Sequence, residues 1–169
     1  MSYSLQCVVT EDFKEPMATT DAHMSSRPPL QVVFDCKDPD SLARFYAGAL
    51  HYKLQDPPEG YETWEQWLKE HGVPEAEWNS ASAIVDPSAK GPRIYFQQLD
   101  TPKLGKNRLH IDMNLSEGSR AAHEARKKQV DSEVDRIARL GARKDHELDE
   151  NGEYCVIMLD PEGNEFCVQ

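Results

Sequence analysis

Acidic, amide and histidine side chains recur at alternate positions of segments that are rich in strand-forming residues. His110, Asp112 and Asn114 alternate with apolar residues in one such segment, and Glu165 and Cys167 do so near the C-terminus. Alternate residues of a strand point to the same face of a sheet. Clustered carboxylates raise one another's pKa, so one of them can transfer a proton near neutral pH. The pattern is therefore compatible with metal-free proton transfer. The alternative is that these groups only hydrogen-bond the backbone or an arginine across the cleft.

The first half of the chain carries a second set of polar residues with strand spacing. Gln31 and Asp35 share one face of a predicted strand, and Tyr95 and Gln97 share one face of another. We expect these faces to meet those of the second half around a polar cavity that contains His110. Three carboxylates are then the candidate catalytic residues: Asp112, Glu165 and Asp35.

All three tryptophans of the chain lie in or near a predicted helix at 61–71. Aromatic rings offer a large contact area, so Trp64, Trp67 and Trp78 are candidates for a lid over an apolar ligand. The alternative interpretation is that the three rings pack this helix against the sheet.

Composition and motifs exclude several function classes. The 169 residues carry a net charge of −11, so the chain lacks the basic surface expected of a protein that binds nucleic acid or anionic membrane. No apolar run approaches the ~20 residues needed to cross a bilayer, and we expect no secretion signal. The four cysteines form no CxxC pair, and we interpret them as reduced and the protein as cytoplasmic. The sequence has no phosphate-binding glycine loop and no nucleophile elbow. A small-molecule ligand is the expected partner.

Hydrophobic periodicity predicts an α+β fold with the order β-α-β-β-β, given twice. The first copy spans about 30–104 and carries the extra helix at 61–71, the second spans about 105–169, and 1–29 is an N-terminal arm. Helices are expected around 42–50 and 116–140. The expected strands are 31–36, 52–55, 82–85, 93–99, 108–115, 142–147, 154–159 and 165–168.

This repeat, together with several local motifs, resembles the vicinal oxygen chelate superfamily, and in particular the glyoxalase-like (glyoxalase/bleomycin resistance) proteins of the actinobacterial type. The resemblance is carried by Lys37-Asp38-Pro39 followed by Phe45-Tyr46, by the terminal turn that starts at Asp160-Pro161, and by the segments 62–68 and 105–112. It covers about 30–169. It implies a curved mixed sheet around a cleft, and a homodimer.

The resemblance also implies a metal site. Members that bind a divalent metal such as zinc, nickel, manganese or iron place one ligand on the first strand and one on the last strand of each module. The matching positions here are Gln31, Gln97, His110 and Cys167. Gln97 and Cys167 depart from the family pattern, which has carboxylates there, and two neutral amides with one histidine are a weak set for a hard ion.

Two functions from different classes follow. The first is a glyoxalase-like small-molecule enzyme of the lyase or isomerase type, possible with or without a metal. The alternative is a metal-free protein of the same fold that sequesters an antibiotic or metabolite, which the missing carboxylates favour. A third reading is an interaction module that uses the N-terminal arm. The expected ligand-binding residues are Gln31, Tyr95, Gln97, His110, Asn114, Trp64 and Cys167.

Overall fold

The computed structural model describes residues 30–115, 123–150 and 153–169. The expected N-terminal arm at 1–29 and the expected turn at 151–152 lie outside the described residues. No helix in the described ranges has both the length and the apolar character that are needed to cross a membrane.

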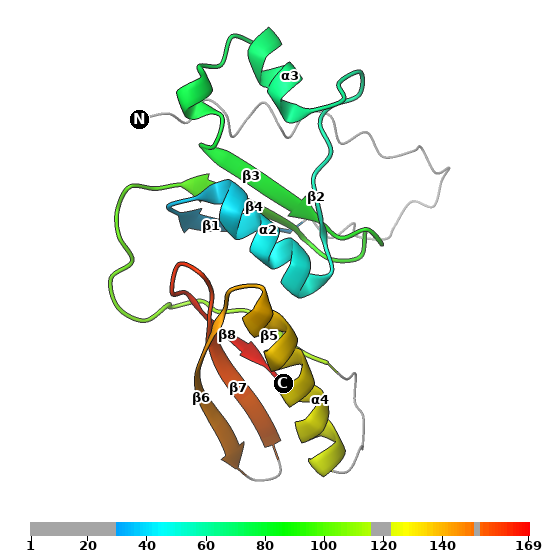
Figure 1. The fold of residues 1–169 in the computed structure, drawn as a ribbon, viewed down its shortest axis with the longest axis vertical. Helices are drawn as coiled ribbons and strands as arrows, with labels where there is room; N and C mark the ends of the chain where they lie inside the picture. The colour runs from blue at the N-terminus through cyan, green and yellow to red at the C-terminus, as the bar shows by residue number, and fades with distance from the viewer. Residues whose placement is uncertain (1–29, 116–122, 151–152) are drawn as a thin grey trace, which may run out of the picture.

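The first half forms a four-stranded sheet with the strand order β1-β4-β3-β2 (Figure 1). Strand β1 runs parallel to β4, and the other two pairings are antiparallel. The elements in chain order are β1 (Gln31–Cys36), α2 (Pro39–Leu50), β2 (Lys53–Leu54), α3 (Trp64–Glu70), the short 3-10 helix η1 (Glu75–Glu77), β3 (Ala81–Val85) and β4 (Arg93–Gln98).

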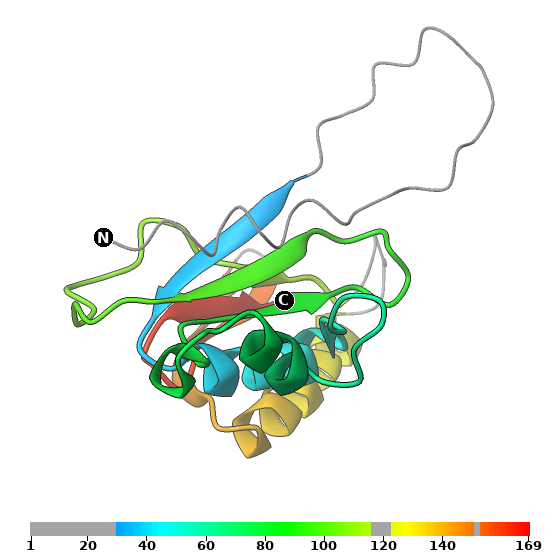
Figure 2. The ribbon, with the colours of Figure 1, turned by 90° about the horizontal axis from the view of Figure 1, so that it is seen from above.

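The second half repeats this topology with the strand order β5-β8-β7-β6. Its elements are β5 (Asp112–Met113), α4 (His123–Arg139), β6 (Arg143–Glu150), β7 (Glu153–Leu159) and β8 (Glu165–Val168). Helices α2 and α4 lie on the same side of the strands (Figure 2). The repeat and the α+β class that the sequence predicts are thus confirmed.

Helix α2 forms because its sequence provides a cap and an apolar stripe. The Asp38 side chain accepts a hydrogen bond from the backbone N–H of Ser41, and Pro39 occupies the first turn, where its missing N–H costs nothing. Leu42, Phe45 and Tyr46 follow at helical spacing and are buried. The ring of Tyr46 lies over the sheet residues Phe34 and Phe96.

The same helix joins the two halves into one hydrophobic core. The rings of Phe45 and Phe166 lie 6.0 Å apart, and the hydroxyl of Tyr46 donates to the carboxylate of Asp160 over 3.1 Å. Arg136 of α4 donates hydrogen bonds to the carbonyl oxygens of Gly48 and Ala49 at the end of α2. Because the apolar residues of both halves are continuous, each half depends on the other for burial.

Most element bounds lie within three residues of the sequence prediction, but two differ more. The strand expected at 108–115 is confined to Asp112–Met113, which pair with Cys167 and Val168 of β8. The two earlier residues of β8, Glu165 and Phe166, pair with β7 and form no ladder with the segment before Asp112. The helix expected at 116–140 is described only for His123–Arg139, and the residues 116–122 lie outside the described part.

Candidate functional site

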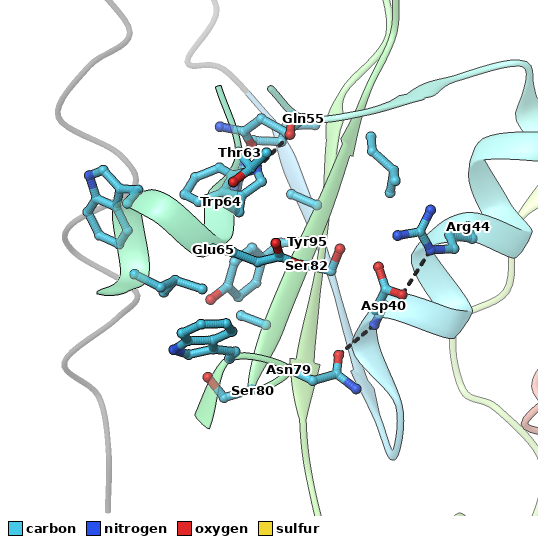
Figure 3. A pocket seen from close by; sticks show the side chains of 17 residues that line it. Asp40, Arg44, Gln55, Thr63, Trp64, Glu65, Asn79, Ser80, Ser82 and Tyr95 are labelled. Carbon is cyan, nitrogen blue, oxygen red and sulfur yellow. Dashed lines mark hydrogen bonds and ion pairs between the residues drawn. The ribbon is translucent and has the colours of Figure 1, made fainter. Parts of the chain in front are cut away.

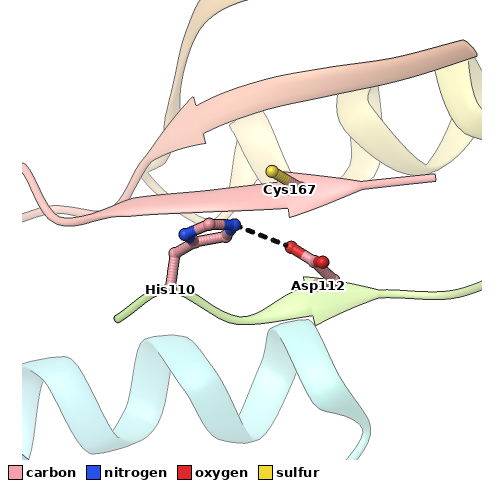
Figure 4. Close-up of side chains that lie close together, drawn as sticks. All are labelled: His110, Asp112 and Cys167. Carbon is pink, nitrogen blue, oxygen red and sulfur yellow. Dashed lines mark ion pairs between the residues drawn. The ribbon is translucent and has the colours of Figure 1, made fainter. Parts of the chain in front are cut away.

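His110, Asp112 and Cys167 form a compact cluster on the second sheet (Figure 4). Strands β5 and β8 are parallel neighbours, and their register places Asp112 beside Cys167 on the same face. The Nε2 atom of His110 lies 3.3 Å from Oδ1 of Asp112. One ligand atom from each of the three residues lies within 4.8 Å of the other two.

This donor set fits a divalent metal ion. Burial first, and then the neighbouring charge of Asp112, raise the pKa of the Cys167 thiol to about 11, so the free thiol is protonated at neutral pH. A bound cation would displace that proton, since cysteine coordinates metals as the thiolate. Imidazole nitrogen, carboxylate oxygen and thiolate sulfur are all zinc ligands, and three protein ligands leave a position for substrate or water.

The four residues of the predicted metal set come from both sheets. His110 and Cys167 belong to the cluster on the second sheet. Gln31 lies on the first sheet, where its side-chain oxygen accepts a hydrogen bond of 2.5 Å from Arg93. Gln97 lies opposite Asp35 in the β1–β4 register, also on the first sheet. The chain therefore groups two of the predicted ligands with Asp112, a residue expected only as an acid or base.

The three candidate catalytic carboxylates do not gather in one place. Asp112 belongs to the metal-type cluster, whereas Asp35 is exposed on β1 of the first sheet. The carboxylate of Glu165 accepts a hydrogen bond of 3.0 Å from the backbone N–H of Asn107 and lies 3.2 Å from Nζ of Lys103. The Asn107 bond above all, with help from Lys103, lowers the pKa of Glu165. Glu165 is therefore ionised at neutral pH.

Asn114, the remaining predicted ligand-binding residue of the second half, lies beyond the cluster along the chain. Its side-chain oxygen accepts a hydrogen bond of 2.9 Å from the side-chain amide of Gln169.

A cavity of about 490 Å³ lies at the first sheet, between β3, β4 and the segment that carries α3 and η1 (Figure 3). Trp64, Trp67 and Trp78 all line it. Tyr95 lies on the same side of β3 as Trp64, whereas Asp40 and Arg44 lie on the other side. The two predicted ligand-binding residues with aromatic rings, Trp64 and Tyr95, thus line the same cavity.

The tryptophan rings are fixed by hydrogen bonds to the backbone. The indole N–H of Trp64 donates to the carbonyl of Gln55 over 2.8 Å, and that of Trp78 donates to the carbonyl of Val73 over 2.9 Å. Trp67 is nearly buried and meets the ring of Trp64 edge-to-face at 5.8 Å. Because these polar groups of Trp64 and Trp78 are satisfied, their rings offer apolar surface to the cavity. The same tryptophan rings can therefore both pack α3 against the sheet and line the cavity.

Sequence reasoning missed Gln55, which lines the cavity and accepts a hydrogen bond of 2.6 Å from Arg93. A glutamine just after a two-residue strand carries no periodic signal that could single it out.

Comparisons with known proteins give a family and a fold. A family model described as a glyoxalase-like domain matches residues 31–169. No curated protein matches the chain.

Several solved structures share the fold at low sequence identity. An enzyme of the glyoxalase/bleomycin resistance protein/dioxygenase family from Burkholderia phytofirmans is similar with a TM-score of 0.54 and 13% identity, covering 82% of this chain and 94% of that one. A variant of the fosfomycin resistance protein FosX from Listeria monocytogenes is similar with a TM-score of 0.52 and 13% identity, covering 87% and 90%. It was solved with Mn(II) and 1S,2S-dihydroxypropylphosphonic acid. A possible glyoxalase from Bacillus cereus is similar with a TM-score of 0.52 and 12% identity, covering 84% and 97%.

Proposed function

The chain belongs to the glyoxalase-like domain family, and from that premise we propose that it is a small-molecule enzyme of the lyase or isomerase type that uses one divalent metal ion. His110, Asp112 and Cys167 are the proposed ligands. The observation that carries the proposal is their grouping, with ligand atoms within 4.8 Å of one another. The Mn(II) ion of the Listeria neighbour supports a metal in this fold. The thiolate of Cys167 favours zinc over harder ions here.

The proposed roles follow from the positions of the side chains. A metal at the cluster supplies Lewis-acid polarisation of a substrate oxygen. Glu165 shares the face of β8 with Cys167, and its ionised carboxylate is the proposed proton acceptor. We keep Gln31, Gln97 and Asp35 of the first sheet as candidate substrate contacts. In a dimer, the first sheet of a second copy would bring them to the metal site. The proposed location is the cytoplasm, where the thiol of Cys167 stays reduced.

The second candidate function is metal-free binding of a small molecule. The observation that favours it is the cavity at the first sheet, which is lined by fixed tryptophan rings and lies apart from the titratable cluster in the chain. In that case, the ligand is recovered unchanged after release from the protein.

Elemental mass spectrometry of the purified protein tests the metal. We expect about one divalent ion per chain, because three donors of suitable type already lie together. His110→Ala removes one ligand and is expected to lower the metal affinity at least ~100-fold. His146→Ala is the matched control, since His146 is exposed and pairs only with Asp145 among the described residues. Absence of metal after incubation with zinc, nickel, manganese or iron(II) overturns the enzyme proposal in favour of the binding protein.

A homodimer is part of the same proposal. Strands β1 and β5 each end their sheet, and apolar side chains at or near them are exposed, including Leu30 at 71%, Val33 at 45% and Leu109 at 74%. An uncovered apolar edge strand favours pairing with another chain.

Light scattering on the eluting protein measures the mass and tests this assembly. We expect a dimer for the natural chain and a monomer for Val33→Lys. Leu148→Lys on the outer strand β6 changes a side chain of similar exposure, 46%, and is expected to leave the dimer intact. A monomeric natural chain contradicts this part of the proposal.

A further inference from the structure

Two arginines line the cavity at the first sheet, and their surroundings differ. Nε of Arg44 lies 2.8 Å from the carboxylate of Asp40, so its charge is balanced by an ion pair at the surface. Arg93 donates from Nε to the amide oxygen of Gln55 over 2.6 Å and from Nη1 to the amide oxygen of Gln31 over 2.5 Å. Both partners are neutral. In the described part of the chain, Arg93 forms no ion pair.

The guanidinium of Arg93 is therefore a half-buried charge that has no counter-ion among the residues that the structure describes. Loss of hydration lowers the pKa of Arg93, yet an arginine side chain stays protonated in proteins. Two of its five N–H donors are used by Gln55 and Gln31, which leaves three. A charge that is held rigidly and only partly hydrated is the kind of group that binds a carboxylate strongly.

Tyr95 places a second donor in the same cavity. Its ring is buried beneath the guanidinium of Arg93, 5.0 Å from ring centroid to Cζ. Burial raises the pKa of the phenol, which keeps the hydroxyl neutral and able to donate. The hydroxyl makes no hydrogen bond within the described ranges, although the ring lines the cavity on the side of Trp64 (Figure 3).

The remaining residues that line the cavity suit a ligand with a flat apolar part. The rings of Trp64, Trp67 and Trp78 supply aromatic faces, and a volume of about 490 Å³ is within the range of small-molecule sites. Two acidic side chains also line the cavity. Asp40 is neutralised by Arg44, and Glu65 is exposed in the first turn of α3, where water screens it.

We propose that this cavity binds a small aromatic carboxylate, with the carboxylate on Arg93 and Tyr95 and the ring against the tryptophans. The inference names the ligand class of the small-molecule function proposed above and rests on that function. The proposed ligand class depends on no residue of the His110–Asp112–Cys167 cluster. The proposals for the cavity and for the metal site can therefore fail separately.

Calorimetric titration with 3-phenylpropanoate and its uncharged amide, 3-phenylpropanamide, tests the charge. We expect the acid to bind the natural chain about tenfold more tightly or better, because only the acid forms charge-assisted hydrogen bonds. Tryptophan emission should change in parallel, since every tryptophan of the chain lines this cavity. Equal affinity for acid and amide, or no binding of the acid, overturns the proposal without the need for a variant.

Three variants locate the site. Arg93→Gln should lower the affinity for 3-phenylpropanoate about tenfold or more and leave the affinity for the amide within about twofold. The double variant Asp40→Asn/Arg44→Gln is the matched control, because it removes an arginine and its paired carboxylate from the same cavity without a change in net charge, and it should change neither affinity by more than about twofold. His110→Ala should keep the preference for the acid. Loss of that preference in His110→Ala, or its retention in a folded Arg93→Gln, contradicts the assignment.

Discussion

Replacement of Asp160 by alanine is expected to lower the free energy of unfolding by about 3 kcal/mol. Asp160 is the one buried charged residue of the described core, at 1% exposure. Its Oδ1 accepts hydrogen bonds from the backbone N–H groups of Glu162 and Asn164, and its Oδ2 accepts from the side chains of Asn164 and Tyr46. Alanine would leave these four donors without their acceptor inside the protein. Urea unfolding followed by circular dichroism measures the effect.

Asp160→Asn is the control that separates hydrogen bonding from charge. The amide keeps an oxygen for the two backbone N–H groups, so we expect it to cost less than alanine.

Burial raises the pKa of Asp160, and the four donors offset this only in part. The folded state therefore holds the proton to higher pH than the unfolded state, and this group's contribution to stability is largest below the unfolded pKa. The contribution declines as the pH rises through the folded pKa, and the decline should be missing in Asp160→Asn. An Asp160→Ala variant as stable as the natural chain contradicts the account.

Replacement of Phe96 by alanine is expected to lower the free energy of unfolding by about 3–5 kcal/mol. Phe96 is fully buried at the centre of the first sheet. Its ring stacks on Phe34 at 5.4 Å and lies 5.9 Å from the ring of Tyr46 on α2, so truncation opens a void between sheet and helix. The same denaturant titration measures the loss.

Phe96→Leu keeps most of the apolar volume and is expected to cost less than half as much as alanine. A loss below about 1 kcal/mol for alanine would mean that the sheet and α2 close over the void. That result would contradict a rigid packing of the sheet against α2.

The fold was predictable from sequence because runs of β-branched and aromatic residues mark several strands, turn signals separate the elements, and the order of elements repeats. The bounds of β1 and β8 agree with the prediction at both ends, and in each strand the residues of one face are more buried than those of the other. Strand β5 was the poorest prediction. Its residues alternate as far back as His110, but only Asp112 and Met113 pair with β8, although β8 begins two residues before the paired positions. Pairing between distant segments is not encoded in local periodicity.

The candidate site was predictable in part because alternate residues of a strand share a face. Alternation places Asp112 on a face with His110, and Cys167 on a face with Glu165, and the structure has both arrangements. That Asp112 stands beside Cys167 depends on the register of two parallel strands, which the sequence does not specify. The hydrogen bonds of Arg93 to the side-chain amides of Gln31 and Gln55 were not predictable for a similar reason, because the three residues come from separate segments of the chain.

The turn that precedes β8 has a consequence for how the two halves diverge in evolution. The carboxylate of Glu162 accepts hydrogen bonds from the backbone N–H groups of Lys37 and Asp38, just before α2, and Asp160 of the same turn binds Tyr46. A short loop of the second half thus holds the helix of the first half, in addition to the Arg136 hydrogen bonds and the shared core. Recombination that exchanges one half for that of a relative must keep this loop matched to the helix that it holds. The effects of substitutions in this turn and at the start of α2 are therefore expected to depend on one another.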